Sequence, residues 1–432
     1  MQKDPRSPER PRRKGHPGDE INSRVIKRKT ELAKRRLRRR RTALFAFILL
    51  IFAVATALFF YAKSANSKSA IANVKEMKNV AASEPSTKTP PPEQSNAAAT
   101  PTSEAAVEQS LVIIGLGDLL FDRQVARAIK DEGIEDLFSG VEGWLKDGDI
   151  VLGNLENPLS LRGAPVKNKE YTFRGLPEAA GGMRNAGINM VSLANNHTMD
   201  YGPEALADTL DLLNQAGIAY AGAGANSAEA HKHTTLGVKG KKVAFFAYSA
   251  VVPEGSWATA TRPGIATTRE KWSTRLEAIE AASKENDYVM VSFHWGLEYE
   301  DYPQEYQRDF ARRVIDAGAD MVIGHHPHVI QGIEVYKGNI IAYSLGDFVF
   351  DHYSRKTGES FILKTELVGG EVSRVSITPV YADFKGKPAV VHGAEAQAIL
   401  GRLKKISEPF KTEIKITGDT AEIILTPLNE NS

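Results

Sequence analysis

Side chains that bind metal ions gather after predicted strands in this 432-residue chain. A carboxylate follows each of the first two strands, an Asn-Asn-His triplet follows the third, and histidines end the fifth and sixth: Asp118, Glu156, Asn195, Asn196, His197, His294, His325, His326 and His328. In open α/β sheets, ligands collect outside the carboxyl ends of the strands, so we expect these side chains to meet at one edge. Neutral imidazoles and carboxylates suit Mn, Zn or Fe. The sequence therefore predicts a divalent metal site, and a carboxylate that bridges two metals is the usual device of a hydrolase.

Each of these motifs also has a purely structural explanation. An Asp after a strand, such as Asp118, often caps a helix, and an Asn-Asn pair can form a turn. A single histidine such as His294 is more often hydrogen-bonded in the core than bound to a metal. Taken together, the motifs favour a metal site, because six of the ten histidines lie in or just after these strand ends: His197, His294, His325, His326, His328 and His352. The chain has no cysteine, which excludes disulfides and thiolate ligands.

Short apolar segments that alternate with amphipathic ones supply these strand ends. Buried strands are predicted at 111–117, 149–155, 188–194, 243–249, 288–293, 320–324 and 340–346. Between them, helices are predicted at 203–216 and 306–317. This alternation predicts an α/β architecture over 110–360. The remaining residues, 361–432, are predicted to form a strand-rich extension of the same domain around one helix near 394–405.

The first 109 residues have a different composition. Residues 1–41 hold 17 Lys and Arg against 5 Asp and Glu, and residues 42–62 contain no charge, Gly or Pro. A basic tail before about 20 apolar residues predicts a cytoplasmic N-terminus and a single helix across the cell membrane, with the body extracytoplasmic. A cleaved signal peptide is the alternative, although the apolar segment exceeds the usual length. Nucleic-acid binding is disfavoured because the basic cluster adjoins the predicted membrane surface, and residues 63–109 are predicted to be a disordered linker.

Six segments closely resemble the CapA family, known also as the poly-γ-glutamate capsule synthesis protein. They are GLGDLLFDR (115–123), GNLENPL (153–159), SLANNHTMDYG (192–202), SFHWGLEY (292–299), GHHPHVIQGIEVY (324–336) and YSLGDFVFD (343–351). The likeness covers about residues 111–382. Because that family is related to the calcineurin-like metallophosphatases, the resemblance implies a four-layer αββα metallophosphatase-like sandwich, here behind the predicted transmembrane helix.

The resemblance also implies roles for individual residues. The implied metal ligands are Asp118, Glu156, Asn196, His294, His326 and His328, and His197 matches the catalytic histidine of the metallophosphatases. Leu120 stands where that superfamily has a metal-binding histidine, so the number of metal ions stays open. Asp347 stands where family members usually have Asn, and it can add a carboxylate to the site. Arg123 and Arg174 are candidates for holding an anionic substrate, with surface salt bridges as the alternative.

The function that the resemblance implies is capsule biosynthesis. We expect a membrane-anchored protein that takes part in poly-γ-glutamate synthesis or export at the outer face, with the polymer or its synthase complex as partner. Residues 42–432 hold 38 basic and 48 acidic residues, a balance that repels a polyanion unless arginines or a metal form a local positive site. The alternative is a surface metallohydrolase, phosphoesterase-like, that acts on a cell-envelope substrate. A likeness of fold alone does not establish that activity.

Overall fold

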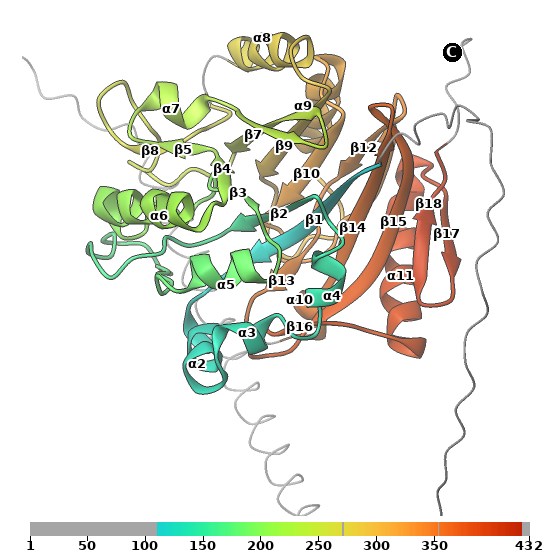
Figure 1. Ribbon diagram of the computed structural model, residues 1–432, viewed down its shortest axis with the longest axis horizontal. Helices are drawn as coiled ribbons and strands as arrows, with labels where there is room; N and C mark the ends of the chain where they lie inside the picture. The colour runs from blue at the N-terminus through green and yellow to red at the C-terminus, as the bar shows by residue number, and fades with distance from the viewer. Residues whose placement is uncertain (1–109, 270–271, 353, 426–432) are drawn as a thin grey trace, which may run out of the picture. The chain divides into compact units, whose positions relative to one another are not determined.

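The computed structural model describes residues 110–269, 272–352 and 354–425 (Figure 1). All of them belong to one compact unit, residues 102–432. The predicted basic tail, transmembrane helix and linker, at 1–109, lie outside the described residues.

No helix among the described residues is long and apolar enough to cross a membrane. The longest of them, α6 (Gly202–Ala216) and α11 (Gly393–Ser407), have 15 residues each, whereas a spanning helix needs about 20 apolar residues. This finding corrects the prediction of a single-pass membrane protein with an extracytoplasmic domain. The segment on which that prediction rested, 42–62, is not among the residues described.

The first sheet has ten strands, and β1 lies near its middle. β1 pairs in parallel with β2 and antiparallel with β14. The strands are β1 (Leu111–Leu119), β2 (Ile150–Leu155), β3 (Met190–Ser192), β4 (Ala219–Ala221), β13 (Asp347–Val349), β14 (Glu359–Val368), β15 (Glu371–Ala382), β16 (Pro388–Val390), β17 (Ile414–Thr417) and β18 (Thr420–Ile423). Because β14 begins at Glu359, the predicted boundary between residues 360 and 361 falls inside a strand of this sheet.

The second sheet has six strands, in the order β11-β12-β10-β9-β7-β6. They are β6 (Thr234–Val238), β7 (Lys241–Ser249), β9 (Tyr288–His294), β10 (Met321–His325), β11 (Ile333–Tyr336) and β12 (Asn339–Ala342). The strands β7, β9, β10 and β12 run parallel to one another. A separate pair is formed by β5 (Ala223–Gly224) and β8 (Gly264–Ile265).

The alternation of side chains along each strand divides the interior into three apolar layers. Ile113 of β1 and Met290 of β9 belong to the core between the two sheets, where α11 adds Leu403. The outer face of the first sheet is covered by α2 (Arg123–Glu132), α3 (Ile134–Leu137), α4 (Glu142–Leu145), α5 (Ala179–Asn185) and α6. The outer face of the second sheet is covered by α7 (Ser227–His231), α8 (Trp272–Ser283) and α9 (Glu305–Asp316). The described residues therefore form a mixed α/β sandwich in the layer order αββα (Figure 1); the short α10 (Arg355–Gly358) and η1 (Glu408–Phe410) complete the elements.

Two glycines allow β1 to approach the segment before β13. A Cβ atom on Gly117 would lie 2.0 Å from Gly346 O, and Gly346 has φ +73°, a conformation that favours glycine. Asp118 N donates to Gly346 O at 3.0 Å. This close contact places Asp118 opposite Asp347 in the β1–β13 register.

The structure confirms most of the predicted elements. The predicted helices at 203–216 and 306–317 correspond to α6 and α9, and the helix near 394–405 corresponds to α11. Six of the seven predicted strands are present. The seventh, predicted at 340–346, ends at Ala342, because the chain then turns toward the close contact at Gly346.

Candidate metal centre

The carboxyl ends of β1, β2, β3, β9 and β10 carry the predicted cluster. Its members lie at or just after these strand ends: Asp118, Glu156, Asn196, His294, His325, His326 and His328. All of them except Asn196 are less than 10% exposed. Side chains that are distant in the sequence therefore meet at one buried edge, as the strand-end rule predicts.

Asn154 in β2 holds two of the carboxylates in place. Its Nδ2 donates to Asp118 Oδ1 at 2.8 Å and to Glu156 Oε2 at 2.5 Å. Its Oδ1 accepts from Asn195 Nδ2 at 3.1 Å. Because Asn195 thereby joins the end of β3 to the end of β2, the two asparagines tie three strand ends together.

The first group of candidate ligands is formed by Asp118, Glu156 and His294, whose ligand atoms lie within 4.8 Å of one another. His294 Nε2 lies 3.6 Å from Glu156 Oε1 and 2.7 Å from Asn196 Oδ1. The amide oxygen of Asn196 therefore faces the same imidazole nitrogen as the Glu156 carboxylate. Asn196 therefore adds a fourth potential ligand beside this group.

The second group is formed by Asp118, His328 and Asp347, and it meets the same distance criterion. His328 Nδ1 lies 2.8 Å from Asp347 Oδ1 and 3.7 Å from Asp118 Oδ2. Asp118 thus belongs to both groups. Asp347, which the sequence offered only as an added carboxylate, lies in the cluster and contacts His328 directly.

His326 lies between the two groups. Its backbone N donates to Asp118 Oδ2 at 3.2 Å, and its ring centroid is 4.8 Å from that of His294 and 5.9 Å from that of His328. His326 and His328 have φ values of +96° and +54°. Such conformations are costly outside glycine and concentrate at functional sites.

Burial controls the protonation of the imidazoles. Burial, with the nearby His326 ring, holds the pKa of His294 well below its usual range, and burial lowers the pKa of His326 to about 3. Both rings are therefore neutral near pH 7, which is the form that binds metal ions. Burial also acts to lower the pKa of His328, but the Asp347 and Asp118 carboxylates raise it to about 10. A cation that binds His328 must displace this proton.

The carboxylates respond to the same surroundings. Burial, and then the Asp118 charge, raises the pKa of Glu156 well above its usual range. Burial acts to raise the pKa of Asp118 as well, but the His325 and His328 imidazoles lower it. Burial raises the pKa of Asp347, although His328 opposes this. A divalent cation would offset the cost of ionising Glu156 and Asp347 beside Asp118.

Unpartnered atoms at this edge fit a bound cation. Glu156 Oε1 and His326 Nδ1 are buried and have no hydrogen-bond partner within the part of the chain that the structure describes. Such atoms are costly unless something else binds them. Two buried ligand groups, built from imidazoles and carboxylates, therefore fit a divalent metal, the second once His328 has lost its proton.

Comparison with known proteins agrees with the resemblance seen in the motifs. The profile of the family described as "Bacterial capsule synthesis protein PGA_cap" matches residues 112–352. The chain belongs to this family. PGA biosynthesis protein CapA of Bacillus subtilis (strain 168) is 33% identical over 285 residues, covering 66% of this chain and 74% of the relative. Capsule biosynthesis protein CapA of Bacillus anthracis is 32% identical over 291 residues, covering 66% and 71%.

Among solved structures, a phosphatase from Mycoplasma pneumoniae is similar with a TM-score of 0.43 and 14% identity. The similarity covers 63% of this chain and 94% of that protein.

In this member of the capsule synthesis family, His197 lies beside the cluster but outside both ligand groups. Its Nδ1 is 2.7 Å from Asp200 Oδ2 and 3.1 Å from Lys169 Nζ. Lys169 also donates to Asn196 O at 2.6 Å and pairs with Asp200. Burial lowers the pKa of His197, although the hydrogen bond with Asp200 opposes this. The histidine is therefore held by a fixed network rather than left mobile.

The two predicted substrate arginines differ in their surroundings. Arg123 pairs with the buried Asp351 at 2.6 Å, and its guanidinium lies over the rings of Phe173 and Phe350 at 4.9 and 5.1 Å. Arg174 lies over the Tyr201 ring at 4.4 Å and donates to Arg162 O at 3.3 Å. Arg123 thus already has an anionic partner, so binding of an anionic substrate there would compete with Asp351.

One residue beside the site was not predicted. Lys169 braces the Asn196–His197 turn. The strand-end pattern does place Asn154, which orients the carboxylates, and His325, whose Nδ1 lies 3.2 Å from Asp118 Oδ1. Lys169 comes from the long segment between β2 and α5, and nothing in the local sequence shows where that segment packs.

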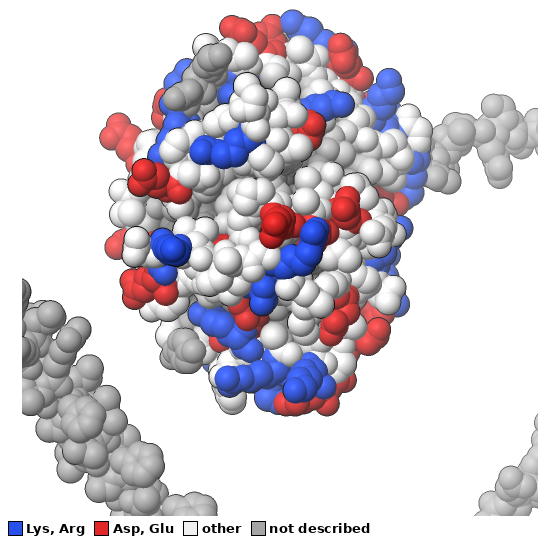
Figure 2. Space-filling model, turned by 90° about the vertical axis from the view of Figure 1, so that its left-hand side faces the viewer, with Lys and Arg blue, Asp and Glu red and all other residues white. Residues whose placement is uncertain are grey.

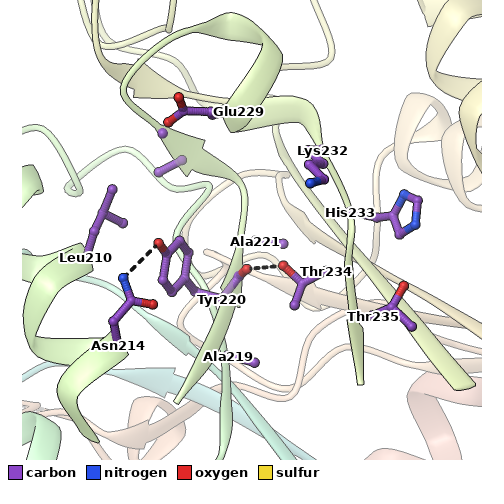
Figure 3. Close-up of a pocket in the computed structure, with 12 residues that line it drawn as sticks. Leu210, Asn214, Ala219, Tyr220, Ala221, Glu229, Lys232, His233, Thr234 and Thr235 are labelled. Carbon is purple, nitrogen blue, oxygen red and sulfur yellow. Dashed lines mark hydrogen bonds between the residues drawn. The ribbon is translucent and has the colours of Figure 1, made fainter. Parts of the chain in front are cut away.

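A cavity of about 530 Å³ lies elsewhere, between α6 and the edge strands β4 and β6 (Figure 3). Tyr220 lies in it, with its hydroxyl accepting from Asn214 Nδ2 at 3.4 Å and its backbone O accepting from Thr234 Oγ1 at 2.6 Å. None of the candidate metal ligands named above lines it.

Proposed function

We propose that this protein takes part in the synthesis or export of poly-γ-glutamate, and that its contribution depends on a divalent ion, Mn, Zn or Fe, at the strand-end cluster. The observation that carries the proposal is the pair of buried ligand groups that share Asp118. The names of the Bacillus relatives, a PGA biosynthesis protein and a capsule biosynthesis protein, support the proposal that the polymer is poly-γ-glutamate.

The proposed ligands are Asp118, Glu156, Asn196 and His294 on one side, and Asp118, His326, His328 and Asp347 on the other. A divalent ion bound there supplies a Lewis acid that polarises a carbonyl or phosphoryl oxygen. Asn154 fixes the two carboxylates, and Asn195 fixes Asn154. The proposal covers one ion or two, because Leu120 offers no ligand to the second group.

A second candidate function is hydrolysis of a phosphoester-like linkage in a cell-envelope substrate, with the metallophosphatase-like fold that the family resemblance implies. The observation that favours it is His197, which adjoins the proposed ligand Asn196. When Nδ1 of His197 donates its hydrogen bond to Asp200, Nε2 is the nitrogen left to take up or release a proton. An imidazole so placed can protonate a leaving oxygen.

The polymer role is tested in a deletion strain that is complemented with full-length variants. Loss of capsular polymer on deletion, rescue by the wild type and failure of Asp118→Asn would support the proposal. His392→Ala is the control, because His392 is an exposed histidine that pairs with Asp419 and belongs to neither ligand group. Normal polymer in the deletion strain, or full rescue by Asp118→Asn, would contradict it.

The two candidate functions differ in what they require of His197. If the protein is a hydrolase, His197→Ala should keep its metal and lower turnover about 10²–10⁴-fold, the usual share of a general acid. If the cluster serves binding or assembly, His197→Gln should restore polymer production fully. Unchanged turnover in the Ala variant of an active preparation would remove His197 from the chemistry.

A further inference from the structure

A second polar cavity lies on the outer side of the second sheet. Its volume is about 160 Å³, and it is lined by Ser227, His231, Trp257, Thr267, Arg269 and Arg275, with Ala258. These residues come from α7, the segment around β8, and α8. The cavity is large enough for a short carboxylate-bearing group.

The arginines around this cavity have no acidic partner among the residues that the structure describes. Across the described residues, neither Arg269 nor Arg275 forms an ion pair with a carboxylate, and the same holds for Arg262, which lies over the Trp257 ring at 5.5 Å. Arg312 and Arg402, by contrast, are paired with carboxylates: Arg312 contacts Glu334 at 2.6 Å and Arg402 contacts Asp301 at 2.5 Å. Arg269 and Arg275, which line the cavity, and Arg262, which lies over the lining residue Trp257, form a local positive site within a protein body of negative balance.

The surroundings supply hydrogen-bond donors in excess. Arg275 Nε, Trp272 Nε1 and Tyr248 Oη are buried without a hydrogen-bond partner among the described residues. The Trp272 and Tyr248 rings are 5.9 Å apart. Buried donors without acceptors are costly, and burial lowers the pKa of Arg275. Of these three residues Arg275 lines the cavity, so an anion bound there would supply its guanidinium with an acceptor and a countercharge.

His231 is not part of this surplus. Its Nδ1 lies 2.8 Å from Ser227 O, and its Nε2 accepts from Thr267 N at 3.3 Å. Both ring nitrogens are therefore satisfied, and the tautomer that this pattern requires is neutral. The positive charge of the cavity comes from the arginines alone.

The cavity is connected to the edge that carries the metal cluster. Ser249 at the end of β7 pairs in register with His294 at the end of β9, and Ala250 N donates to His294 O at 2.9 Å. The chain continues through Val252, whose carbonyl accepts from Arg269 at 2.8 Å. One short loop thus joins a candidate metal ligand to the rim of the cavity.

We propose that this cavity binds a carboxylate of poly-γ-glutamate through Arg275 and Arg269, and so holds the polymer beside the metal cluster. The proposal rests on the polymer role proposed above. A guanidinium matches a planar carboxylate with two parallel hydrogen bonds. Figure 2 shows the side of the molecule on which α7 lies in Figure 1; basic and acidic side chains are mixed there, without one continuous basic field. Recognition must therefore be local, as a single arginine cavity provides.

The test titrates the full-length protein with glutarate, a dicarboxylate that resembles one glutamate unit, and with γ-linked glutamate oligomers, by calorimetry. Arg275→Gln should weaken both interactions about 10- to 100-fold, the usual effect of losing hydrogen bonds between charged groups. Arg184→Gln, at an exposed arginine of α5, is the matched control and should bind as the wild type does. Because all variants keep the same basic N-terminal tail, their difference reports the cavity.

Two results would overturn the proposal. One is equal binding by wild type and Arg275→Gln when both unfold at the same temperature. The other is displacement of glutarate by inorganic phosphate at equal concentration, which would make the cavity a general anion site. A failure of the proposed function is distinguishable from both results. It would appear as normal capsular polymer in the deletion strain, independently of whether the protein binds glutarate.

Discussion

Asp118 contacts four other residues of the candidate metal centre. Its Oδ1 accepts from Asn154 at 2.8 Å and lies 3.2 Å from His325. Its Oδ2 accepts from His326 N at 3.2 Å and lies 3.7 Å from His328. Because Asp118 also belongs to both ligand groups, a change at this residue should disturb both.

The first prediction concerns the imidazoles. His294→Ala and His326→Ala should each weaken metal affinity by at least about 10- to 100-fold, the loss known even for residues that only support ligands. The reason is that both are neutral, buried rings that face the cluster. Full-length protein exposed to Mn, Zn and Fe is then examined by elemental analysis.

His392→Ala is the control for this experiment. His392 is exposed and lies 3.1 Å from Asp419, so its loss should leave the metal content unchanged. Wild-type metal content in His326→Ala, or a wild-type protein that takes up none of the three metals, would contradict the metal centre.

At the scale of elements, the contact between Gly117 and Gly346 brings the two aspartates of the second ligand group together. Gly117→Ala would place a Cβ 2.0 Å from Gly346 O, a backbone atom that cannot rotate away. The strand and the loop must then separate, and we expect a loss of about 1–3 kcal/mol in the free energy of unfolding, as for an overpacked core. Thermal unfolding measures the loss, and metal content should fall with it.

Gly143→Ala is the matched control. Gly143 is exposed in α4, and its added Cβ would meet nothing within 4 Å. Alanine is the better helix residue, so stability should stay equal or rise by up to about 1 kcal/mol. Equal stability of the Gly117→Ala protein and the wild type would show that the close contact is not maintained.

The stability of the protein should depend on pH through Asp320, which directly precedes β10. Asp320 Oδ2 accepts from Val289 N at 2.7 Å, and burial raises the pKa of Asp320 to about 6 from an ordinary value of 3.8. An acid whose pKa is raised in the folded state contributes most to stability below pH 3.8, where it is protonated in both the folded and the unfolded state. This contribution is lost as the pH rises from 3.8 through about 6. Asp320→Asn does not titrate, so its stability relative to wild type should rise by about 2–3 kcal/mol between pH 4 and pH 7.

Denaturant unfolding at both pH values tests this prediction. Asp287→Asn is the control, because Asp287 accepts an equivalent bond from Lys242 N at 2.7 Å but is exposed, so it should show no such gain. A difference between Asp320→Asn and wild type that stays constant from pH 4 to pH 7 would contradict the raised pKa.

Sequence patterns predicted the elements and the gathering of side chains better than they predicted the pairing of strands. Apolar runs identify buried strands, and strand ends collect ligands, so Glu156, Asn196 and His294 were expected to lie together, and they do. Their role as ligands remains a prediction. The pairing of β1 with β14 was not predicted, because antiparallel pairing across so long a separation leaves no local signal. The bond from Arg123 to Asp351 was missed for the same reason.

For the whole molecule, the family match ends before the first sheet is complete. It covers residues 112–352, whereas β14, β15 and α11 follow it and fill the core between the sheets with Phe361, Leu363, Leu367, Val375, Ile377, Ile399, Leu400 and Leu403. Each such side chain contributes about 1.5–3 kcal/mol when buried, and a domain has only about 5–15 kcal/mol in total. The C-terminal segment is therefore needed for the sandwich that holds the site.

A chain that ends at residue 358 should accordingly be insoluble or unfold without cooperativity. Soluble yield and thermal unfolding, compared with the full-length protein, measure this. Co-expression of residues 359–432 as a separate fragment should restore part of the soluble yield, because the missing strands can pair with β1. A truncated chain that unfolds as sharply as the full-length protein would contradict the requirement.

The position of β1 between β2 and β14 has a consequence during translation. Leu111 pairs with Leu367 and Gly115 with Leu363, so β1 leaves the ribosome about 250 residues before its antiparallel partner. At about 5–20 residues per second, that delay is roughly 10–50 seconds. Throughout it, the nascent chain carries an apolar strand with one open edge, which is the feature that templates wrong pairing. Asp118 meets Asp347 only when the delay is nearly over, so the second ligand group forms late in synthesis.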